Sequence, residues 1–206
     1  GYAHVHGMQA AVHCIGDACL DRVLNSFEKA LAADPRPDCR HGIVHCQITR
    51  PDQLERMTRL GLHIYAQSIF LDYDIHIVRQ RAGDELAATS YSWKTLLDTG
   101  ATVSNGSDCP VEAPDVLAGI QCAVTRQDLH GCAPYLPREA FTIKEALDSF
   151  TQAGAFASFE EHTKGRIVPG YCADFVVLGE DPFQTAPAKI KDIPILQTWM
   201  EGERVW

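Results

Sequence analysis

Two histidines and one aspartate follow short apolar runs, in an order from which a metal site could be assembled. His13 and His45 each end such a run, and Asp108 follows a third run after a few small polar residues. Neutral imidazoles together with a carboxylate suit zinc or a similar divalent ion. An ion of this kind lowers the pKa of a bound water toward neutrality, which provides a nucleophile for hydrolysis. Any one of these residues alone would be a polar strand end, but three in order favour a site.

The elements that would position these residues alternate between strand and helix. In a (β/α) barrel every strand end opens onto the same face, so residues at these ends would converge there. The stretch 68–90 is less regular, and we expect a loop with helical pieces. Apolar patterning predicts strands near 8–13, 41–46, 62–67 and 101–105, and helices near 18–33, 51–60, 93–98, 116–127 and 143–159. Asp17 is a plausible N-cap for the first of these helices.

The pattern changes toward the end of the chain. Residues 173–178 and 195–200 are strand-like, and Glu201-Gly202 predicts a two-residue turn into the last strand. We therefore expect an α/β domain over residues 1–164 and antiparallel strands of a smaller unit over residues 165–206.

Composition narrows the class of protein. The chain has 206 residues, of which 46% are hydrophobic, so it can bury a sizeable core. Its net charge of −9 argues against a nucleic-acid or anionic-membrane partner. No basic leader and no apolar run of membrane-spanning length is visible, so we expect a cytoplasmic protein. The eight cysteines are scattered without a Cys-x-x-Cys pair, which favours buried thiols over disulfides.

Several segments, spread over nearly the whole chain, carry a family resemblance. They are Val12-His13-Cys14-Ile15-Gly16-Asp17, the stretch 40–47 (RHGIVHCQ), Gly106-Ser107-Asp108-Cys109-Pro110-Val111, the stretch 142–147 (TIKEAL) with Thr151, the stretch 165–174 (GRIVPGYCAD), Asp181-Pro182, and Trp199-Met200-Glu201-Gly202. In this order they resemble the amidohydrolase superfamily, in particular the amidohydrolase-3 group of metal-dependent hydrolases that includes N-substituted formamide deformylase-like enzymes. The ordered combination is specific, although each piece alone is weak.

The resemblance implies the C-terminal half of a metal-dependent-hydrolase (β/α)8 TIM barrel, plus strands of a small β-sandwich. It also implies that a first-strand His-x-His pair and the first four strands lie outside this chain. The pair His4-Val5-His6 does not replace them, because only six residues separate His6 from His13 and a parallel crossover needs a dozen or more. A half-barrel exposes strand edges, so we expect a second copy of the chain or an N-terminal fragment as partner.

The resemblance also implies roles for the three residues. His13 would bind the metal, which we expect to be zinc, held weakly by this chain alone. His45 would bind a second metal or polarise the substrate carbonyl, with a core histidine as the alternative. Asp108 would contact the metal, take the proton of the attacking water and pass it to the leaving nitrogen. Relatives often have an acid where this chain has Val44.

Further polar residues are candidates for substrate contact. Gln67 follows the third predicted strand, and Tyr91, Trp93 and Arg126 match family positions near the pocket. Each could equally be a packing or strand-end residue. His41 would lie deeper, where a structural hydrogen bond is the better interpretation.

Three functional classes remain open. The leading one is a metal-dependent hydrolase that acts on C–N bonds in a small-molecule amide, formamide or cyclic amide. The second is a deaminase of the same superfamily, and the third is a non-catalytic truncated or regulatory protein on the same fold. Fold alone does not choose among them, and the sequence does not identify a substrate.

Overall fold

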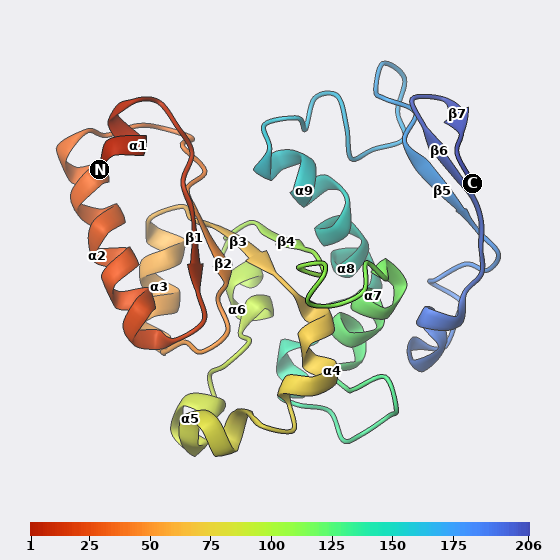
Figure 1. Cartoon of the computed structure of the whole chain (residues 1–206), viewed down its shortest axis with the longest axis horizontal. Coiled ribbons are helices and arrows are strands. Elements are labelled where there is room, and N and C mark those ends of the chain that lie inside the picture. Colours follow the sequence, from red (N-terminus) through yellow and green to blue (C-terminus); the bar gives the residue numbers. More distant parts are fainter. The chain divides into compact units, whose positions relative to one another are not determined.

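The computed structural model describes residues 1–206, and the chain divides into two compact units (Figure 1). The first unit contains Gly1–Ala66 and Asp74–Val103, and the second contains Gln67–Tyr73 and Ser104–Trp206. These units do not follow the expected division after residue 164, so that domain boundary stays a prediction. None of the helices is both long and apolar enough to cross a membrane.

A parallel sheet forms the centre of the first unit. Its strands are β1 (Ala11–Cys14), β2 (Gly42–His45) and β3 (His63–Ala66), and β4 (Val103–Asn105) comes next in the sheet order. β1 pairs with β2 and β2 with β3, both in parallel. β2 and β3 are mostly buried, as expected for strands of a covered parallel sheet, whereas β1 exposes Ala11 and His13. The predicted alternation of parallel strands and helices is confirmed.

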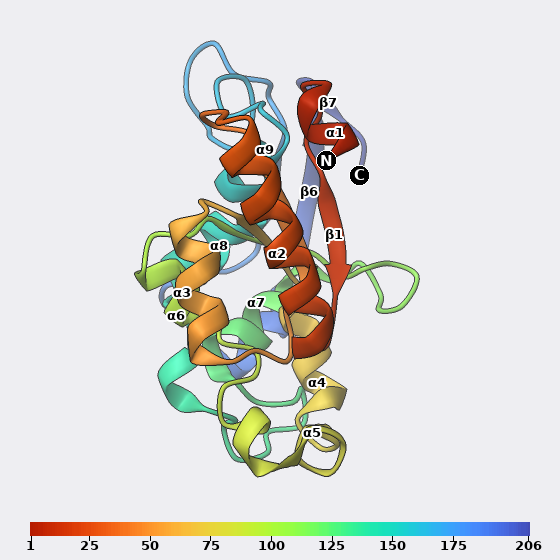
Figure 2. The same cartoon turned by 90° about the vertical axis from the view of Figure 1, so that its left-hand side faces the viewer.

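Helices α2 (Asp17–Ala33) and α3 (Pro51–Arg59) lie side by side next to β1 and β2 (Figures 1 and 2). α2 buries Leu20, Leu24 and Phe27, one face of a helix with a period of 3.6 residues. Gly16 is the N-cap of α2, so the expectation that Asp17 caps this helix is wrong. The Asp17 carboxylate instead accepts a hydrogen bond from Arg50 at 3.0 Å.

The first unit contains further helices. They include α1 (Tyr2–Val5), α5 (Val78–Ala87) and α6 (Trp93–Asp98), while α4 (Leu71–Asp74) crosses from one unit into the other. The expected loop with helical pieces over 68–90 is therefore confirmed, because it contains α4, α5 and the 3-10 turn η1 (Ser68–Phe70).

In the second unit, α7 (Val116–Thr125) is the central helix, and its residues 117–123 are all buried. The 3-10 segments η1 and η3 (Pro187–Asp192) pack against it, as does α8 (Ile143–Phe150). A further 3-10 turn, η2, spans Pro137–Glu139. The helix expected over 143–159 is broken at Thr151, where α9 (Gln152–Ala157) begins.

The second unit ends in an antiparallel sheet, as predicted (Figure 1). β5 (Phe175–Leu178) pairs with β6 (Ile195–Met200), which pairs with β7 (Glu203–Arg204). Glu201 and Gly202 both have positive φ angles, 51° and 82°, so the two-residue turn is confirmed. Such angles are typical of the type I′ turn that matches the twist of a hairpin.

Candidate metal centre

His13 and His45 meet at the carboxyl ends of two neighbouring parallel strands. Their imidazole rings are in edge-to-face contact, with centroids 4.4 Å apart and an interplanar angle of 80°. His13 is exposed, whereas His45 is 3% exposed. The structure therefore brings together two of the three predicted metal ligands, and it leaves one of the two rings accessible.

This contact depends on an irregularity at the end of β2. The sheet register places His13 opposite Val44 and Cys14 opposite His45, so a regular pleat would direct the two imidazoles to opposite faces. His45 has a φ of 74°, and Cys46 follows with 53°. A left-handed backbone ends the alternation of the pleat, which allows the His45 ring to reach His13.

Trp93 holds the backbone at this irregular strand end. Its indole Nε1–H donates to the carbonyl oxygens of His45 at 3.0 Å and of Cys46 at 3.2 Å. Trp93 itself is 1% exposed and lies at the start of α6. Its observed contacts are those of a packing residue that fixes β2, and its predicted contact with substrate stays a prediction.

A half-buried carboxylate next to this strand end was not among the residues predicted from sequence. Asp74 accepts hydrogen bonds from Gln47 Nε2 at 2.8 Å and from the Tyr91 hydroxyl at 3.0 Å. The Tyr91 backbone N–H also donates to the Gln47 carbonyl at 2.6 Å. Burial raises the pKa of Asp74, and the two side-chain hydrogen bonds oppose that rise.

The Gln47–Asp74–Tyr91 cluster ties the segment after His45 to α4 and to the chain before α6. Tyr91 has a φ of 53°, so it joins His45 and Cys46 among the non-glycine residues in the left-handed region. Unfavourable backbone angles of this kind gather at functional sites. The sequence contained only a weak indication of a role for Asp74, which was its position in the irregular stretch 68–90.

Asp108 belongs to the second unit, so its predicted contact with the two histidines stays a prediction. It has a φ of 57°, and its carbonyl accepts the Val111 N–H at 2.8 Å. A cavity of ≈ 270 Å³ in this unit is lined by Asn105, Gly106 and Ser107, by the start of α7 and by Phe150. This cavity is large enough for a small molecule and lies directly before the predicted catalytic carboxylate in the sequence.

The two other predicted substrate contacts also lie in the second unit. Gln67 is 5% exposed and precedes η1, where its carbonyl accepts the Phe70 N–H at 3.0 Å. Arg126 is 1% exposed at the end of α7, and its Nε donates to the Tyr135 carbonyl at 3.0 Å. Both are therefore buried in their unit, and their predicted substrate contacts stay predictions.

A second histidine pair lies in the first unit, between α1 and the entry to β2. The Ala10 N–H donates to His41 Nδ1 at 3.0 Å, so neutral His41 has its proton on Nε2. That proton is donated to His4 Nδ1 at 2.9 Å, and His4 Nε2 donates to the Asp34 carbonyl at 2.6 Å. The structural hydrogen bond expected for His41 is confirmed.

The thiol of Cys39 lies close to this second pair, so three atoms of ligand type are within 4.8 Å of one another. A metal ion on His41 Nε2 would require that nitrogen to lose its proton while the Ala10 N–H still occupies Nδ1. His41 would then be an imidazolate, which is unfavourable. Burial lowers the pKa of His41, and the electrostatic effect of the neighbouring His4 and Arg36 side chains lowers it further. The second pair is therefore structural.

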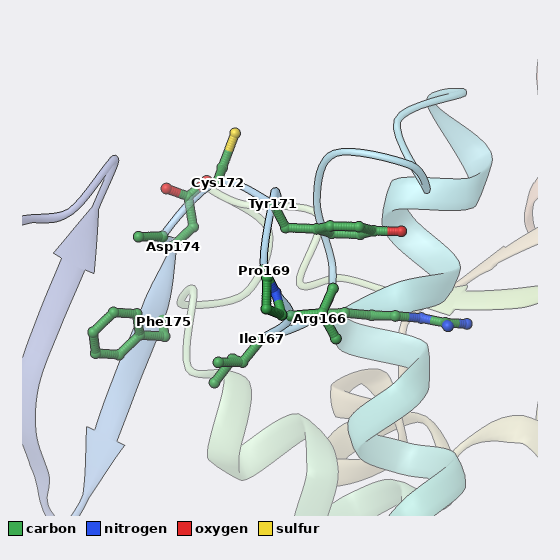
Figure 3. Close-up of a pocket in the computed structure, with 9 residues that line it drawn as sticks. Arg166, Ile167, Pro169, Tyr171, Cys172, Asp174 and Phe175 are labelled. Carbon is green, nitrogen blue, oxygen red and sulfur yellow. The ribbon is translucent and has the colours of Figure 1, made fainter.

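Figure 3 shows another cavity, of ≈ 210 Å³, in the second unit. It is lined by consecutive residues of the loop 166–175 that leads into β5, including Ile167, Pro169 and Phe175. Among the residues labelled in Figure 3, only Arg166 and Asp174 have charged side chains. The Tyr171 hydroxyl donates a hydrogen bond to the Glu161 carbonyl at 2.8 Å. It carries no cluster of residues suited to hydrolysis.

Comparisons with known proteins identify the family of the chain. The chain is 35% identical over 207 residues to YtcJ of Bacillus subtilis (strain 168), which is named as an amidohydrolase, and 28% identical over 197 residues to the N-substituted formamide deformylase of Arthrobacter pascens. These alignments cover 99% and 95% of the chain but only 38% and 36% of the relatives. The chain thus spans little more than a third of their length.

Two solved structures of metal-dependent hydrolases are also similar to this chain. An uncharacterised metal-dependent hydrolase from Pyrococcus horikoshii OT3 superposes with a TM-score of 0.76 at 29% identity, over 88% of this chain and 36% of that one. A counterpart from Pyrococcus furiosus gives a TM-score of 0.72 at 30% identity, over 85% and 34%. The sequence profile of the amidohydrolase family matches residues 2–206. The chain therefore belongs to the amidohydrolase family, in its amidohydrolase-3 group.

Proposed function

We propose that this chain contributes His13 and His45 to the divalent-metal site of a hydrolase that acts on C–N bonds. The observation that carries the proposal is the contact between their rings, 4.4 Å apart at the carboxyl ends of adjacent parallel strands. In barrels built from such strands, catalytic groups lie at this end. The proposed substrates are amides, formamides or cyclic amides, and similarity to a protein named as an N-substituted formamide deformylase supports the formamides among them.

The residues present fit a divalent ion. Two imidazoles from rigid strands offer neutral nitrogen ligands, which zinc and related ions accept. One of the rings is exposed, so an ion could enter, and the backbone of the other is fixed by Trp93. When bound, such an ion supplies an activated water and polarises the substrate carbonyl. Zinc is our proposal for its identity.

From the order of residues along the chain, we propose that Asp108 acts with the two histidines. Its carboxylate would accept the proton of the attacking water and deliver it to the leaving nitrogen. His45 would bind the ion or orient the substrate carbonyl. The cavity with Asn105 and Ser107 in its wall would hold the acyl portion of the substrate.

We further propose that residues 1–164 are the C-terminal half of a (β/α)8 barrel and that the strands after residue 165 belong to a β-sandwich. The matched relatives are much longer than this chain, so the complete site would take further ligands from outside the matched segment. A second copy of the chain, or an N-terminal segment, would cover the exposed strand edges.

Calorimetric titration with Co²⁺ and Zn²⁺ tests the site in the chain itself. We expect weak one-to-one binding that falls at least about tenfold in His13→Asn and His45→Asn, since each loses a ligand. The matched control is His6→Asn, which removes an exposed histidine from the end of α1. Equal affinities in wild type and both site variants, or loss of binding only in the control, would refute the proposal.

A second experiment tests the reaction class. In a full-length relative of the family, fused to this chain in place of its own matching segment, N-substituted formamides and cyclic amides are assayed for hydrolysis. Asp108→Asn should lower kcat by at least about a hundredfold, because the proton acceptor is lost. Circular dichroism should show an unchanged fold. Full activity in this variant would remove Asp108 from the mechanism.

A further inference from the structure

Two cysteines in the first unit have their sulfur atoms in direct contact. Cys14 is the last residue of β1, and Cys19 lies in the first turn of α2. Their Sγ atoms are 3.4 Å apart, although the residues are separated by five positions in the sequence. The short turn from β1 into α2, visible in Figure 2, brings the strand end and the helix start together.

The two thiols differ in accessibility. Cys14 is 1% exposed, whereas Cys19 is exposed. The Cys19 Sγ also lies 3.8 Å from the carbonyl oxygen of His13. A reagent in solution can therefore reach Cys19 first, with a buried thiol already in contact behind it. An accessible cysteine with a second thiol in contact is one feature of cysteine pairs that are oxidised to a disulfide through a sulfenic acid.

We propose that Cys14 and Cys19 form an oxidisable dithiol that closes to an intramolecular disulfide with a peroxide. The Cys19 sulfur attacks one peroxide oxygen, the O–O bond breaks and one water leaves, which gives a sulfenic acid at Cys19. The Cys14 sulfur then attacks the Cys19 sulfur, the S–O bond breaks, and a second water leaves with the Cys14 proton. Two thiols are oxidised by two electrons, and hydrogen peroxide is reduced to two waters.

Disulfide formation requires the two sulfur atoms to move closer together. A disulfide needs the sulfurs at about 2.05 Å, so they must approach from the observed 3.4 Å. Gly16 lies in the intervening turn, where it is the N-cap of α2 and has an extended backbone. Cys14 directly follows His13, so the disulfide would form next to the candidate metal centre.

The experiment is peroxide treatment of the purified chain, followed by alkylation of remaining thiols and peptide mapping by mass spectrometry without reduction. We expect a cross-linked pair of peptides containing Cys14 and Cys19, with the loss of two hydrogen atoms, that disappears on reduction with dithiothreitol. Cys19→Ser, an exposed substitution, should abolish this product. Cys172→Ser is the matched control, since Cys172 is an exposed cysteine in the other unit, and it should leave the product unchanged.

Other outcomes overturn the proposal. A disulfide between Cys14 and the buried Cys46 would show that a different pair reacts. Sulfinic acid at Cys19 with a free Cys14 would show that the buried thiol does not resolve the sulfenic acid. An intermolecular disulfide between two Cys19 residues would also show that Cys14 does not resolve the sulfenic acid. Because the readout is covalent chemistry on this chain, it does not depend on whether the proposed hydrolase function is correct.

Discussion

The first unit contains two histidine pairs that are built in opposite ways. In the pair His4–His41, ring nitrogens are directly hydrogen-bonded at 2.9 Å and both residues are almost fully buried. In the pair His13–His45, the rings touch edge to face and one of them is exposed. The two outer nitrogens of the first pair are hydrogen-bonded to the backbone, since His41 Nδ1 accepts from the Ala10 N–H and His4 Nε2 donates to the Asp34 carbonyl.

The difference shows how surroundings decide what a histidine does. In the pair His4–His41, each ring has one nitrogen bonded to the backbone and the other bonded to its partner ring, so a metal would have to displace those bonds. At the strand end that carries His13, the exposed ring can be reached by an ion that arrives from solution. The predictions below, ordered from the largest expected effect to the smallest, test this contrast between a structural pair and a metal-binding pair.

Replacement of His41 should have the largest effect on folding. His41→Ala removes a buried ring that stacks on Phe27, with centroids 5.1 Å apart, and it leaves Ala10 N–H and His4 without their partner. We expect the free energy of unfolding to fall by about 4 kcal/mol. His13→Ala, at an exposed position, should change it by less than about 0.5 kcal/mol. Urea unfolding followed by circular dichroism measures the stability of both variants. Equal losses of stability would contradict the distinction between a structural pair and a metal-binding pair.

The buried histidines should also make the fold sensitive to acid. Burial, with a smaller contribution from the positive charge of Arg40, lowers the pKa of His63 from 6.5 to about 4. Between these values the unfolded chain binds a proton that the folded chain does not. Stability is therefore complete above pH 6.5 and is lost as the pH falls toward 4, by about 3 kcal/mol for this residue.

His63→Gln isolates this contribution from that of other groups. Unfolding by urea between pH 7 and 4 should show a smaller loss of stability in His63→Gln than in wild type. The control His162→Gln alters a histidine that is 89% exposed and should keep the wild-type pH dependence. The same slope in all three proteins would show that His63 is protonated equally in the folded and unfolded chain.

Trp93→Phe should affect both stability and the metal-binding pair. It keeps most of the buried ring but removes the Nε1–H that donates to the carbonyls of His45 and Cys46. We expect a loss of about 1 kcal/mol in stability and about tenfold weaker Co²⁺ binding, because the backbone that orients His45 loosens. Calorimetry checks the affinity. Unchanged Co²⁺ affinity, with the stability loss present, would separate Trp93 from the metal centre.

The smallest effect is expected at His6, the other histidine of the His4-Val5-His6 motif. Its Nδ1 is 2.9 Å from the Tyr2 carbonyl and its ring stacks on Tyr2, so its contacts are local and exposed. His6→Ala should change stability by less than about 0.5 kcal/mol and leave Co²⁺ binding unchanged. A clear loss of binding in this variant would make the motif a metal ligand after all.

Much of the fold followed from the sequence. The order of strands and helices, the parallel and antiparallel sheets and the turn at Glu201-Gly202 were all predicted, because local periodicity and turn chemistry decide them. The helix over 143–159 was predicted as one element. Its break at Thr151, with φ of −129° and ψ of −86°, left no mark in the periodicity, since apolar residues continue on both sides.

The sequence by itself also placed His13 and His45 at strand ends, where the chemistry of a metal site could be recognised. Only the tertiary structure decided that their rings meet, because the left-handed backbone at His45 overrides the alternation that the strand register would impose. It likewise decided that Asp74 joins Gln47 and Tyr91, and that His41 is satisfied by Ala10 and His4. Residue types and periodicity are local properties, whereas hydrogen-bond partners distant in sequence exist only once the chain has packed.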